Sequence, residues 1–315
     1  MKEVLVVYYS QTGQLFDIVS NISSAIESED IQITYLQITP EDAYEFPWKK
    51  DAFFDVFPES FLQIPSPLKE SNPEVFNKKY DLVILGYQVW YLSPSIPVNS
   101  FLKSENAKKI LNNTPVLTVI GCRNMWVQAQ EKVKTLLVSC NAKLVGNIAL
   151  VDRHINHISV LTITHWMFKG KKDRFLGFFP KPGVSDKDIK GVITFAPSIK
   201  KALRTNNFQD LQQELVSLGA VKIKPFLVLA DKRANLLFSK WAKVIYKKGK
   251  AGDPKRKKIL IIFNYYLLFA IWVIAPLVFI VFLVTYIFMF KKIHTEKIYY
   301  SSVDTKKINE RRLHY

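Results

Sequence analysis

Hydrophobic residues in the first part of the chain fall into short runs separated by a segment of helical spacing. Residues 3–9 (EVLVVYY) are apolar and β-branched at their centre, which is typical of a strand buried on both faces of a parallel sheet. Residues 31–38 (IQITYLQI) alternate and predict a second strand. Residues 15–27 predict a helix between them, because apolar side chains recur at helical spacing at Leu15, Ile18, Val19, Ile22 and Ile26. We expect a right-handed crossover for this βαβ opening.

The same alternation continues to residue 151. Apolar runs predict three more strands, at residues 81–85, 115–120 and 143–151. Helical segments at residues 97–109 and 126–140 separate them. Strands that alternate with helices favour a doubly wound α/β sheet. Five strands at this spacing fit the flavodoxin-like order 2-1-3-4-5, with helices on both faces of the sheet.

Two regions are less regular. Residues 40–75 are rich in proline and aromatic residues, and a connection this long is expected to serve as a lid or binding loop. Within it, residues 44–65 either cover an apolar substrate or simply cap the sheet edge. In the later region, Ser185 with Asp188 three positions on predicts the start of a helix, and residues 207–219 predict another.

An uncharged apolar segment, residues 259–290, follows near the C-terminus. As one helix it would be about 48 Å long, whereas about 20 residues cross a bilayer core of about 30 Å. We expect a single transmembrane helix that tilts, kinks at Pro276 or begins in the interface around Asn264, with a re-entrant hairpin about Pro276 as the alternative. The sequence thus divides into a domain, an extension packed on it, a basic juxtamembrane linker, a transmembrane helix and a polar tail, at residues 1–151, 152–239, 240–258, 259–290 and 291–315.

The charge is strongly positive, with a formal net charge of +17. Many of the Lys and Arg residues flank the apolar segment, a pattern that suits anionic lipid headgroups better than nucleic acid, so we expect no nucleic-acid partner. The N-terminal flank is the richer one, which predicts that the large domain lies in the cytoplasm, on the inner membrane. The two cysteines, Cys122 and Cys140, form no CxxC motif, in keeping with a reducing compartment.

A candidate phosphate loop follows the first predicted strand. It is the turn Ser10-Gln11-Thr12-Gly13-Gln14, which opens a helix. A helix N-terminus presents free N–H groups to an anion, two hydroxyls can add donors, and a glycine allows close approach of the backbone. The turn lacks the lysine of a P-loop and is not GxGxxG. An ordinary capped turn between strand and helix is the alternative.

Two further loops should meet this turn, because the carboxyl ends of strands one, three and four share one edge of the sheet. The loop after strand three contains Gln88, Val89, Trp90 and Tyr91, and the loop after strand four contains Gly121, Cys122, Arg123, Asn124 and Trp126. Trp90 and Tyr91 could form a flat wall for an isoalloxazine ring. Backbone N–H groups of these loops could bond the edge of the ring.

The candidate proton-transfer groups are His154, His157 and Tyr91. A histidine with a pKa near 6.5 suits a general base, although buried histidines more often fill structural roles. Tyr91 is an alternative proton donor, as is Tyr87. His154 and His157 make an HxxH pair without an evident third ligand, so we expect no metal.

Residues 1–150 resemble flavodoxins and flavodoxin-like quinone reductases. Ser10-Gln11-Thr12-Gly13 matches the family phosphate loop T/S-x-T-G, and residues 87–91 and 121–126 match its ring-binding loops. The resemblance implies FMN as the cofactor. Leu15 stands where the family usually has a threonine, so one phosphate hydroxyl is missing. Many relatives are dimers, which makes a homodimer an expectation by analogy.

A closer likeness joins four features: the opening, residues 46–65, the GCRNMW stretch at 121–126 and the C-terminal anchor. Together they resemble bacterial dialkylresorcinol-condensing enzymes of flexirubin-type pigment synthesis, which accompany a ketosynthase. This resemblance implies oxidation of a lipophilic dialkylcyclohexane-1,3-dione to a dialkylresorcinol. The name "condensing" fits poorly, because neither cysteine has the context of an acylated nucleophile. An NAD(P)H-dependent quinone reductase and a non-enzymatic electron carrier or ketosynthase docking partner remain the alternatives.

Overall fold

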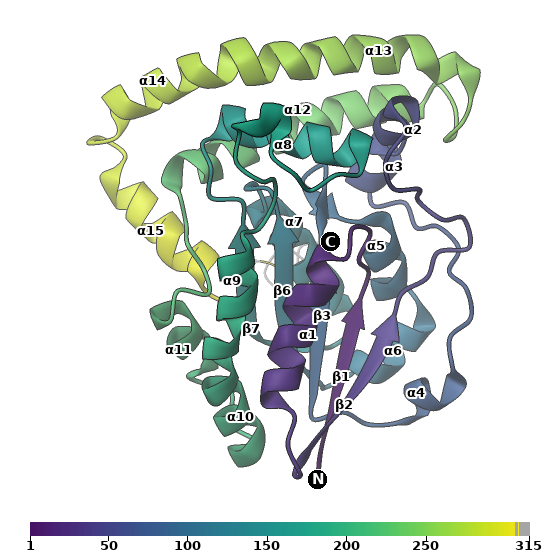
Figure 1. The fold of residues 1–315 in the computed structure, drawn as a ribbon, viewed down its shortest axis with the longest axis vertical. Coiled ribbons are helices and arrows are strands. Elements are labelled where there is room, and N and C mark those ends of the chain that lie inside the picture. Colours follow the sequence, from purple (N-terminus) through teal and green to yellow (C-terminus); the bar gives the residue numbers. More distant parts are fainter. Residues whose placement is uncertain (306–307, 309–315) are drawn as a thin grey trace.

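A five-stranded parallel sheet forms the centre of the protein in this computed structural model, which describes residues 1–305 and 308. The strand order is β2-β1-β3-β6-β7, which confirms the predicted flavodoxin-like order (Figure 1). The strands span β1 Lys2–Tyr8, β2 Ile31–Gln37, β3 Leu82–Tyr87, β6 Pro115–Cys122 and β7 Lys143–Val151.

Alternate side chains of the strands enter two separate cores. On β1, Val4 and Val6 pack toward one face, whereas Leu5 and Val7 pack toward the other. The middle strand β3 is buried at every position, which explains its continuous apolar sequence. The register places Val4 opposite Leu82 across the β1–β3 pair.

Helices cover both faces of the sheet. One face carries α1 with later elements of the chain, at α1 Gln14–Ile26, α9 Asp186–Gly191, η2 Val192–Phe195, α10 Ala196–Thr205 and α11 Leu211–Ser217. The other face carries α5 Ile96–Leu102, α6 Glu105–Leu111 and α7 Val127–Ser139. The single helix predicted at 97–109 is therefore wrong, because a new helix starts where Ser104 Oγ accepts the Ala107 N–H at 3.1 Å.

The proline-rich segment 40–75 contains three short helices, α2 Lys50–Asp55, α3 Phe57–Phe61 and α4 Pro73–Asn77. The sequence showed no regular pattern here, because helices of five or six residues are too short to carry one. The aromatic part of this segment, residues 44–65, lies against the carboxyl ends of the strands. We call residues 44–65 the lid.

Two further elements of the extension complete the domain. Helix α8 (Asn156–Lys169) follows β7, and the short η1 (Phe175–Gly177) follows α8. The predicted start at Ser185 is confirmed, since Ser185 Oγ accepts the Asp188 N–H at 3.1 Å. The helix predicted at 207–219 is present as α11, at Leu211–Ser217.

A helical hairpin crosses the top of the domain in Figure 1. Its first arm is α12 (Pro225–Tyr246), and its second is one long helix made of α13 (Pro254–Phe269), the π-helical turn η3 (Ala270–Ile274) and α14 (Ala275–Thr285). Helix α15 (Phe290–Ser301) then returns toward the sheet. We call residues 254–285 the apolar helix; it is long and apolar enough to cross a membrane by length and composition.

The C-terminal elements differ in detail from the sequence prediction. The apolar helix ends at Thr285 rather than at residue 290, and the chain reverses at 286–289 rather than at Pro276. Pro276 has no N–H to bond the preceding turn. The π-helical turn directly before it accommodates the proline, so the helix continues. Residues 240–246 belong to α12 and 254–258 to α13, and 290–301 form α15, so helices occupy much of the expected linker and tail.

Candidate functional site

The candidate phosphate loop joins β1 to α1, at the carboxyl edge of the sheet. Gly13 has φ of 83°, a left-handed conformation that glycine adopts without strain. Among residues 1–305 and 308 no side chain caps α1, which leaves donors among the first N–H groups of the helix, apart from the Phe16 N–H, which bonds Ser10 Oγ at 3.2 Å. The turn therefore has the free donors that an anion requires.

The two glutamines of this loop hold neighbouring segments. Gln11 Nε2 donates to the Tyr44 carbonyl at 3.3 Å, and Gln11 Oε1 accepts from Trp48 Nε1 at 3.1 Å, which fastens the lid to the loop. Gln14 Oε1 accepts the Val184 N–H at 2.9 Å. These side chains shape the loop from outside, so any contact with a phosphate would come from its backbone and hydroxyls.

A tight hairpin follows β3. Strands β4 (Val89–Trp90) and β5 (Ser93–Pro94) are joined by Tyr91 and Leu92, which both have positive φ, 48° and 60°. This is the backbone of a type I′ turn, which is usually built from Gly or Asn. Bulky residues in this conformation store strain, a feature that concentrates at functional sites.

Tyr91 is held as a neutral phenol. Its hydroxyl donates to the Phe53 carbonyl of the lid at 2.7 Å, and burial raises its pKa well above the ordinary value. Tyr87 is similar, because its hydroxyl donates to Gln130 Oε1 at 2.6 Å inside the core and its pKa is also raised by burial. Both hydroxyls donate a hydrogen bond within the protein, so both tyrosines have a structural role in this conformation.

Trp90 lies in an aromatic cluster that joins the lid to the sheet. Its ring makes edge contacts with Tyr44 (centroids 5.0 Å apart), Trp48 (5.4 Å) and Tyr9 (6.0 Å). The Trp90 carbonyl accepts from Ser60 Oγ at 3.1 Å. Trp90, predicted as part of a flat wall, therefore lies under the lid, with Tyr44 and Trp48 against its ring.

The loop after β6 is fixed by Asn156 at the start of α8. Asn156 Oδ1 accepts from Arg123 Nη1 at 2.8 Å and from Asn124 Nδ2 at 3.0 Å. Burial lowers the Arg123 pKa to about 10. Burial also raises the pKa of the Cys122 thiol, so this cysteine is no thiolate nucleophile. Trp126 is in the core, 3% exposed.

Two buried polar atoms in these loops lack a hydrogen-bond partner within residues 1–305 and 308. They are Gln88 Nε2, a donor after β3, and Asn124 Oδ1, an acceptor after β6. Unpaired buried polar groups are costly, and a ligand can satisfy them. The pyrimidine edge of a flavin carries both carbonyl acceptors and an N–H donor, so the residues present fit FMN. The phosphate would fall to the turn 10–14 and the ring to the loops after β3 and β6.

The candidate histidines flank Asn156, the residue that fixes the loop after β6. His154 is exposed, and its backbone N–H bonds Asp152 Oδ1 at 2.9 Å. His157 Nε2 is 3.2 Å from the Ile271 carbonyl, with its ring 5.0 Å from that of Trp272, so it faces the apolar helix. No group of three or more His, Cys, Asp or Glu that could hold a metal occurs in the part of the chain that the structure describes.

Two buried titratable groups escaped the sequence analysis. Asp231 on α12 caps α7 through the Gln128 N–H at 3.2 Å, and burial raises its pKa to about 7. Lys132 Nζ on α7 donates to Ser93 Oγ at 2.6 Å and lies 3.8 Å from the centre of the Phe61 ring, and burial lowers its pKa to about 7. For Asp231, the only indication in the sequence was a single aspartate in a largely apolar helical segment. Asp231 also lines a cavity of about 160 Å³ beside Trp126.

Comparison with known proteins finds distant likenesses. No family model matches the sequence, and no curated protein matches it. Similar solved structures include a protein from Bacteroides eggerthii DSM 20697 assigned as a flavoprotein (17% identity, 54% of this chain, 100% of that chain, TM-score 0.37). A flavoprotein in complex with FMN from Lactobacillus acidophilus NCFM has 18% identity, over 47% of this chain and 92% of that chain (TM-score 0.36). RosB with bound 8-demethyl-8-formylriboflavin-5'-phosphate has 9% identity, over 71% and 92% (TM-score 0.34). Likenesses this distant transfer neither ligand nor activity to this chain.

Proposed function

We propose that this protein binds FMN at the carboxyl edge of the sheet and acts as a membrane-attached oxidoreductase. One observation carries the proposal. The phosphate loop with its free helix N-terminus and the two ring loops with unpaired Gln88 Nε2 and Asn124 Oδ1 belong to adjacent strands, β1, β3 and β6. A compact anionic cofactor with a polar-edged ring would satisfy all three.

The reaction we propose is the aromatisation of a dialkylcyclohexane-1,3-dione to a dialkylresorcinol. It removes two electrons and two protons from the ring, one hydrogen leaving as hydride and the other as a proton to a base. Bound FMN would supply the two-electron acceptor, regenerated by oxygen or a membrane quinone. The resemblance of the lid, the 121–126 loop and the C-terminal segment to dialkylresorcinol enzymes supports this choice of substrate, as does the apolar helix beside the site.

The chain itself would orient the substrate, exclude water and hold the proton. Trp90 with lid residue Trp48 forms an apolar wall beside the ring loops. Among the candidate bases, Tyr91 has its hydroxyl bound to the lid and His157 has a ring nitrogen at the Ile271 carbonyl. His154 is exposed and lies two residues before Asn156, which holds the loop after β6, and it is the base we favour.

An FMN titration of the detergent-solubilised full chain tests the cofactor, with Gln88→Leu as the decisive variant. Gln88 Nε2 is buried without a partner, so a purely structural role predicts equal or higher thermal stability on replacement and no effect on FMN. A ligand role predicts FMN binding weakened by about tenfold, the equivalent of about 1.4 kcal/mol. Unchanged affinity would remove Gln88 from the site, and a chain that binds no FMN would remove the redox function.

One assay distinguishes the aromatase from a quinone reductase and from an electron carrier. The FMN-loaded protein is incubated with a dialkylcyclohexanedione, and resorcinol formation is followed; a parallel reaction offers NAD(P)H and a quinone. Resorcinol formation supports the aromatase, and quinone reduction without it supports the quinone reductase. A protein that turns over neither but exchanges electrons with a partner protein is a carrier. A ketosynthase partner and a homodimer are further proposals, which co-purification and light scattering would test.

A further inference from the structure

The apolar helix is fixed to the domain at its N-terminal end. Arg256, fully buried, forms a bidentate pair with Glu59 of the lid, with Nη1 to Oε1 at 2.7 Å and Nη2 to Oε2 at 2.9 Å. About two turns further along the helix, Phe263 is also fully buried and packs against α3 and α12. The Gly252 N–H, in the turn before the helix, bonds Asp55 Oδ2 at 2.6 Å.

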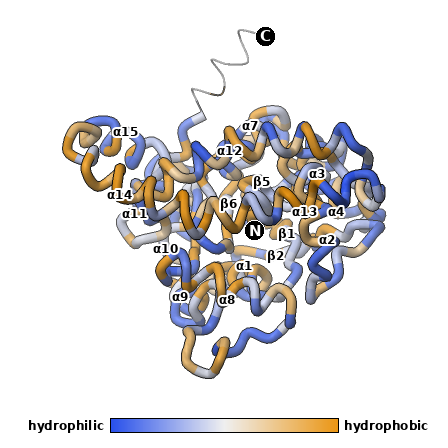
Figure 2. Tube along the Cα trace, turned by 90° about the horizontal axis from the view of Figure 1, so that it is seen from above, coloured by the Kyte–Doolittle hydropathy of each residue, from blue (hydrophilic) through white to orange (hydrophobic). Residues whose placement is uncertain are grey.

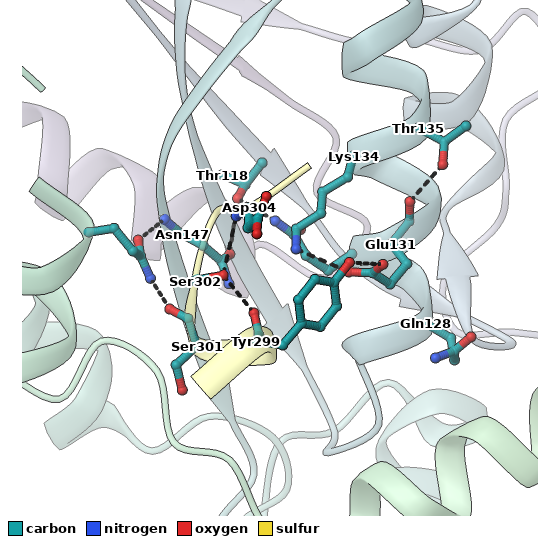
Figure 3. A network of polar contacts seen from close by, with 12 residues as sticks. Thr118, Gln128, Glu131, Lys134, Thr135, Asn147, Tyr299, Ser301, Ser302 and Asp304 are labelled. Atoms are coloured by element: carbon teal, nitrogen blue, oxygen red, sulfur yellow. Dashed lines mark hydrogen bonds and ion pairs between the residues drawn. The ribbon is translucent and has the colours of Figure 1, made fainter. Parts of the chain in front are cut away.

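The chain that leaves the other end of the apolar helix is fixed to the same domain. On α15, Glu296 pairs with Lys232 of α12 at 2.8 Å, and the Tyr299 hydroxyl donates to Glu131 of α7 at 2.7 Å. Gln212 Nε2 donates to the Ser301 carbonyl at 2.7 Å (Figure 3). Lys134, 1% exposed, completes the network through Glu131 at 3.0 Å.

These two attachments have a geometric consequence. A spanning helix must place its two ends on opposite sides of a hydrocarbon layer about 30 Å thick. Here both ends contact one folded domain through charged and polar groups, and α12 accompanies the helix between them, with Phe226 at Phe279 and Trp241 at Tyr266. No bilayer can lie between the ends while these contacts hold.

The side of the apolar helix that faces away from α12 is nonetheless built for lipid. Only 6% of its most apolar 18-residue stretch is buried, and Figure 2, which looks down on the top of the molecule, shows α13 and α14 as largely hydrophobic. Large exposed apolar side chains on it include Ile261, Ile262, Tyr265, Phe269, Trp272, Leu277, Ile280, Val281 and Val284. Exposed lysines stand at both ends: Lys247, Lys248 and Lys250 before it, Lys255, Lys257 and Lys258 at its start, and Lys291 and Lys292 after it. Lysines in these places suit anionic headgroups in one plane.

We infer that residues 254–285 lie in the plane of one membrane leaflet, as a monotopic anchor, and do not span the bilayer. The inner side of the helix then closes the candidate site. Tyr91 of the ring hairpin and Met125 of the β6 loop pack in the same apolar cluster as Phe263, so the helix in the leaflet adjoins the ring loops beside the lid. This inference rests on the proposed membrane attachment and substrate class.

Single cysteines in the full chain test the inference, because native Cys122 and Cys140 are buried. Lys250→Cys lies before the apolar helix and Lys297→Cys after it, and both positions are exposed. The protein is bound to vesicles of phosphatidylcholine and phosphatidylglycerol and treated with a membrane-impermeant maleimide. The in-plane arrangement predicts equal labelling of both positions in intact vesicles. Labelling of only one position until detergent is added would show a spanning helix and overturn the inference.

A second measurement does not depend on labelling. Ile280→Glu places a charge on the outer side of the helix and should abolish flotation with the vesicles, whereas Ile193→Glu, at an exposed apolar position on η2, should leave it unchanged. Equal flotation of the two variants would overturn the lipid-facing assignment. FMN titration of both variants in detergent reports the proposed function separately, since neither substitution touches the ring loops or the phosphate loop.

Discussion

The Phe57 ring on α3 of the lid lies stacked on the Phe263 ring of the apolar helix, with centroids 4.1 Å apart and planes inclined by 10°. Both side chains are fully buried. Phe57 also contacts Tyr91, with ring centroids 5.0 Å apart. One aromatic chain therefore connects the apolar helix, the lid and the strained hairpin after β3.

Phe263→Ala should lower the free energy of unfolding by about 3–5 kcal/mol, because it removes a fully buried ring and leaves a cavity. Phe269→Ala, at a position 53% exposed on the same helix, is the matched control and should change it little. Denaturant unfolding in mild detergent measures both. Equal effects of the two substitutions would mean that the helix does not rest on the lid in solution.

Arg256→Met should destabilise the fold by about 3–5 kcal/mol, since it leaves Glu59 and Asp55 beside a desolvated site without their cation. Lys257→Met, whose ion pair with Asp51 is long at 3.7 Å and exposed, should cost little. Adding Glu59→Leu to Arg256→Met should recover part of the loss, because the uncompensated carboxylate is then gone. A double variant no more stable than Arg256→Met would contradict the coupling between these residues.

Gly13→Ala should weaken FMN binding by about tenfold, because an alanine at φ of 83° costs about 1–2 kcal/mol and shifts the turn. Nothing lies within 4 Å of a Cβ added at Gly13, so the effect would come from the backbone conformation rather than from a clash. Gly191→Ala is the matched control: its surroundings are equally open, but its φ is −67°. FMN affinity that is equal in the two variants would show that the conformation of the turn does not matter to the cofactor.

The sequence predicted the sheet well because buried parallel strands have a strong local signature. The continuous run at 3–9 and the glycine-bearing turn after it are properties of adjacent residues, and both appear as expected. Site features that depend on distant residues could not be read in this way. Gln11 bonds Tyr44 and Trp48 across a segment without periodicity, so nothing local indicates that its side chain holds the lid rather than a ligand.

The same difference between local sequence patterns and contacts of distant residues explains why the prediction for the C-terminal segment was incomplete. Apolar composition alone predicts a spanning helix, since composition reports hydrophobicity and length but not what the helix packs against. The buried Arg256 adjoins three exposed lysines, Lys255, Lys257 and Lys258, and looks like one more basic residue in the sequence. Its pairing with Glu59, nearly two hundred residues away, is visible only in the folded chain.

Asp231→Asn should stabilise the protein more as the pH rises. The Asp231 pKa is raised to about 7 in the fold, whereas an unfolded aspartate titrates near 4, so below about pH 4 the carboxyl is protonated in both states and costs nothing. Between about pH 4 and 7 the native state holds one more proton than the unfolded chain, so the free energy of unfolding of the parent protein falls as the pH rises. Above pH 7 the cost of a charged Asp231 in the fold is complete, on the order of 4 kcal/mol. An asparagine still accepts the Gln128 N–H but does not titrate, so the difference in unfolding free energy between variant and parent should grow across this window.

Lys132 titrates mainly at higher pH. Burial lowers its pKa to about 7 although the Asp231 charge opposes the shift, so in the parent protein its contribution to stability rises between about pH 7 and 10, and measurements from pH 4 to 7 avoid most of it. Asp210→Asn, at an exposed aspartate on the surface, controls for the loss of one charge and should show no such trend. A variant-minus-parent difference for Asp231→Asn that stays constant from pH 4 to 7 would mean that Asp231 is not desolvated against α7, and that the end of α12 sits differently on the sheet edge.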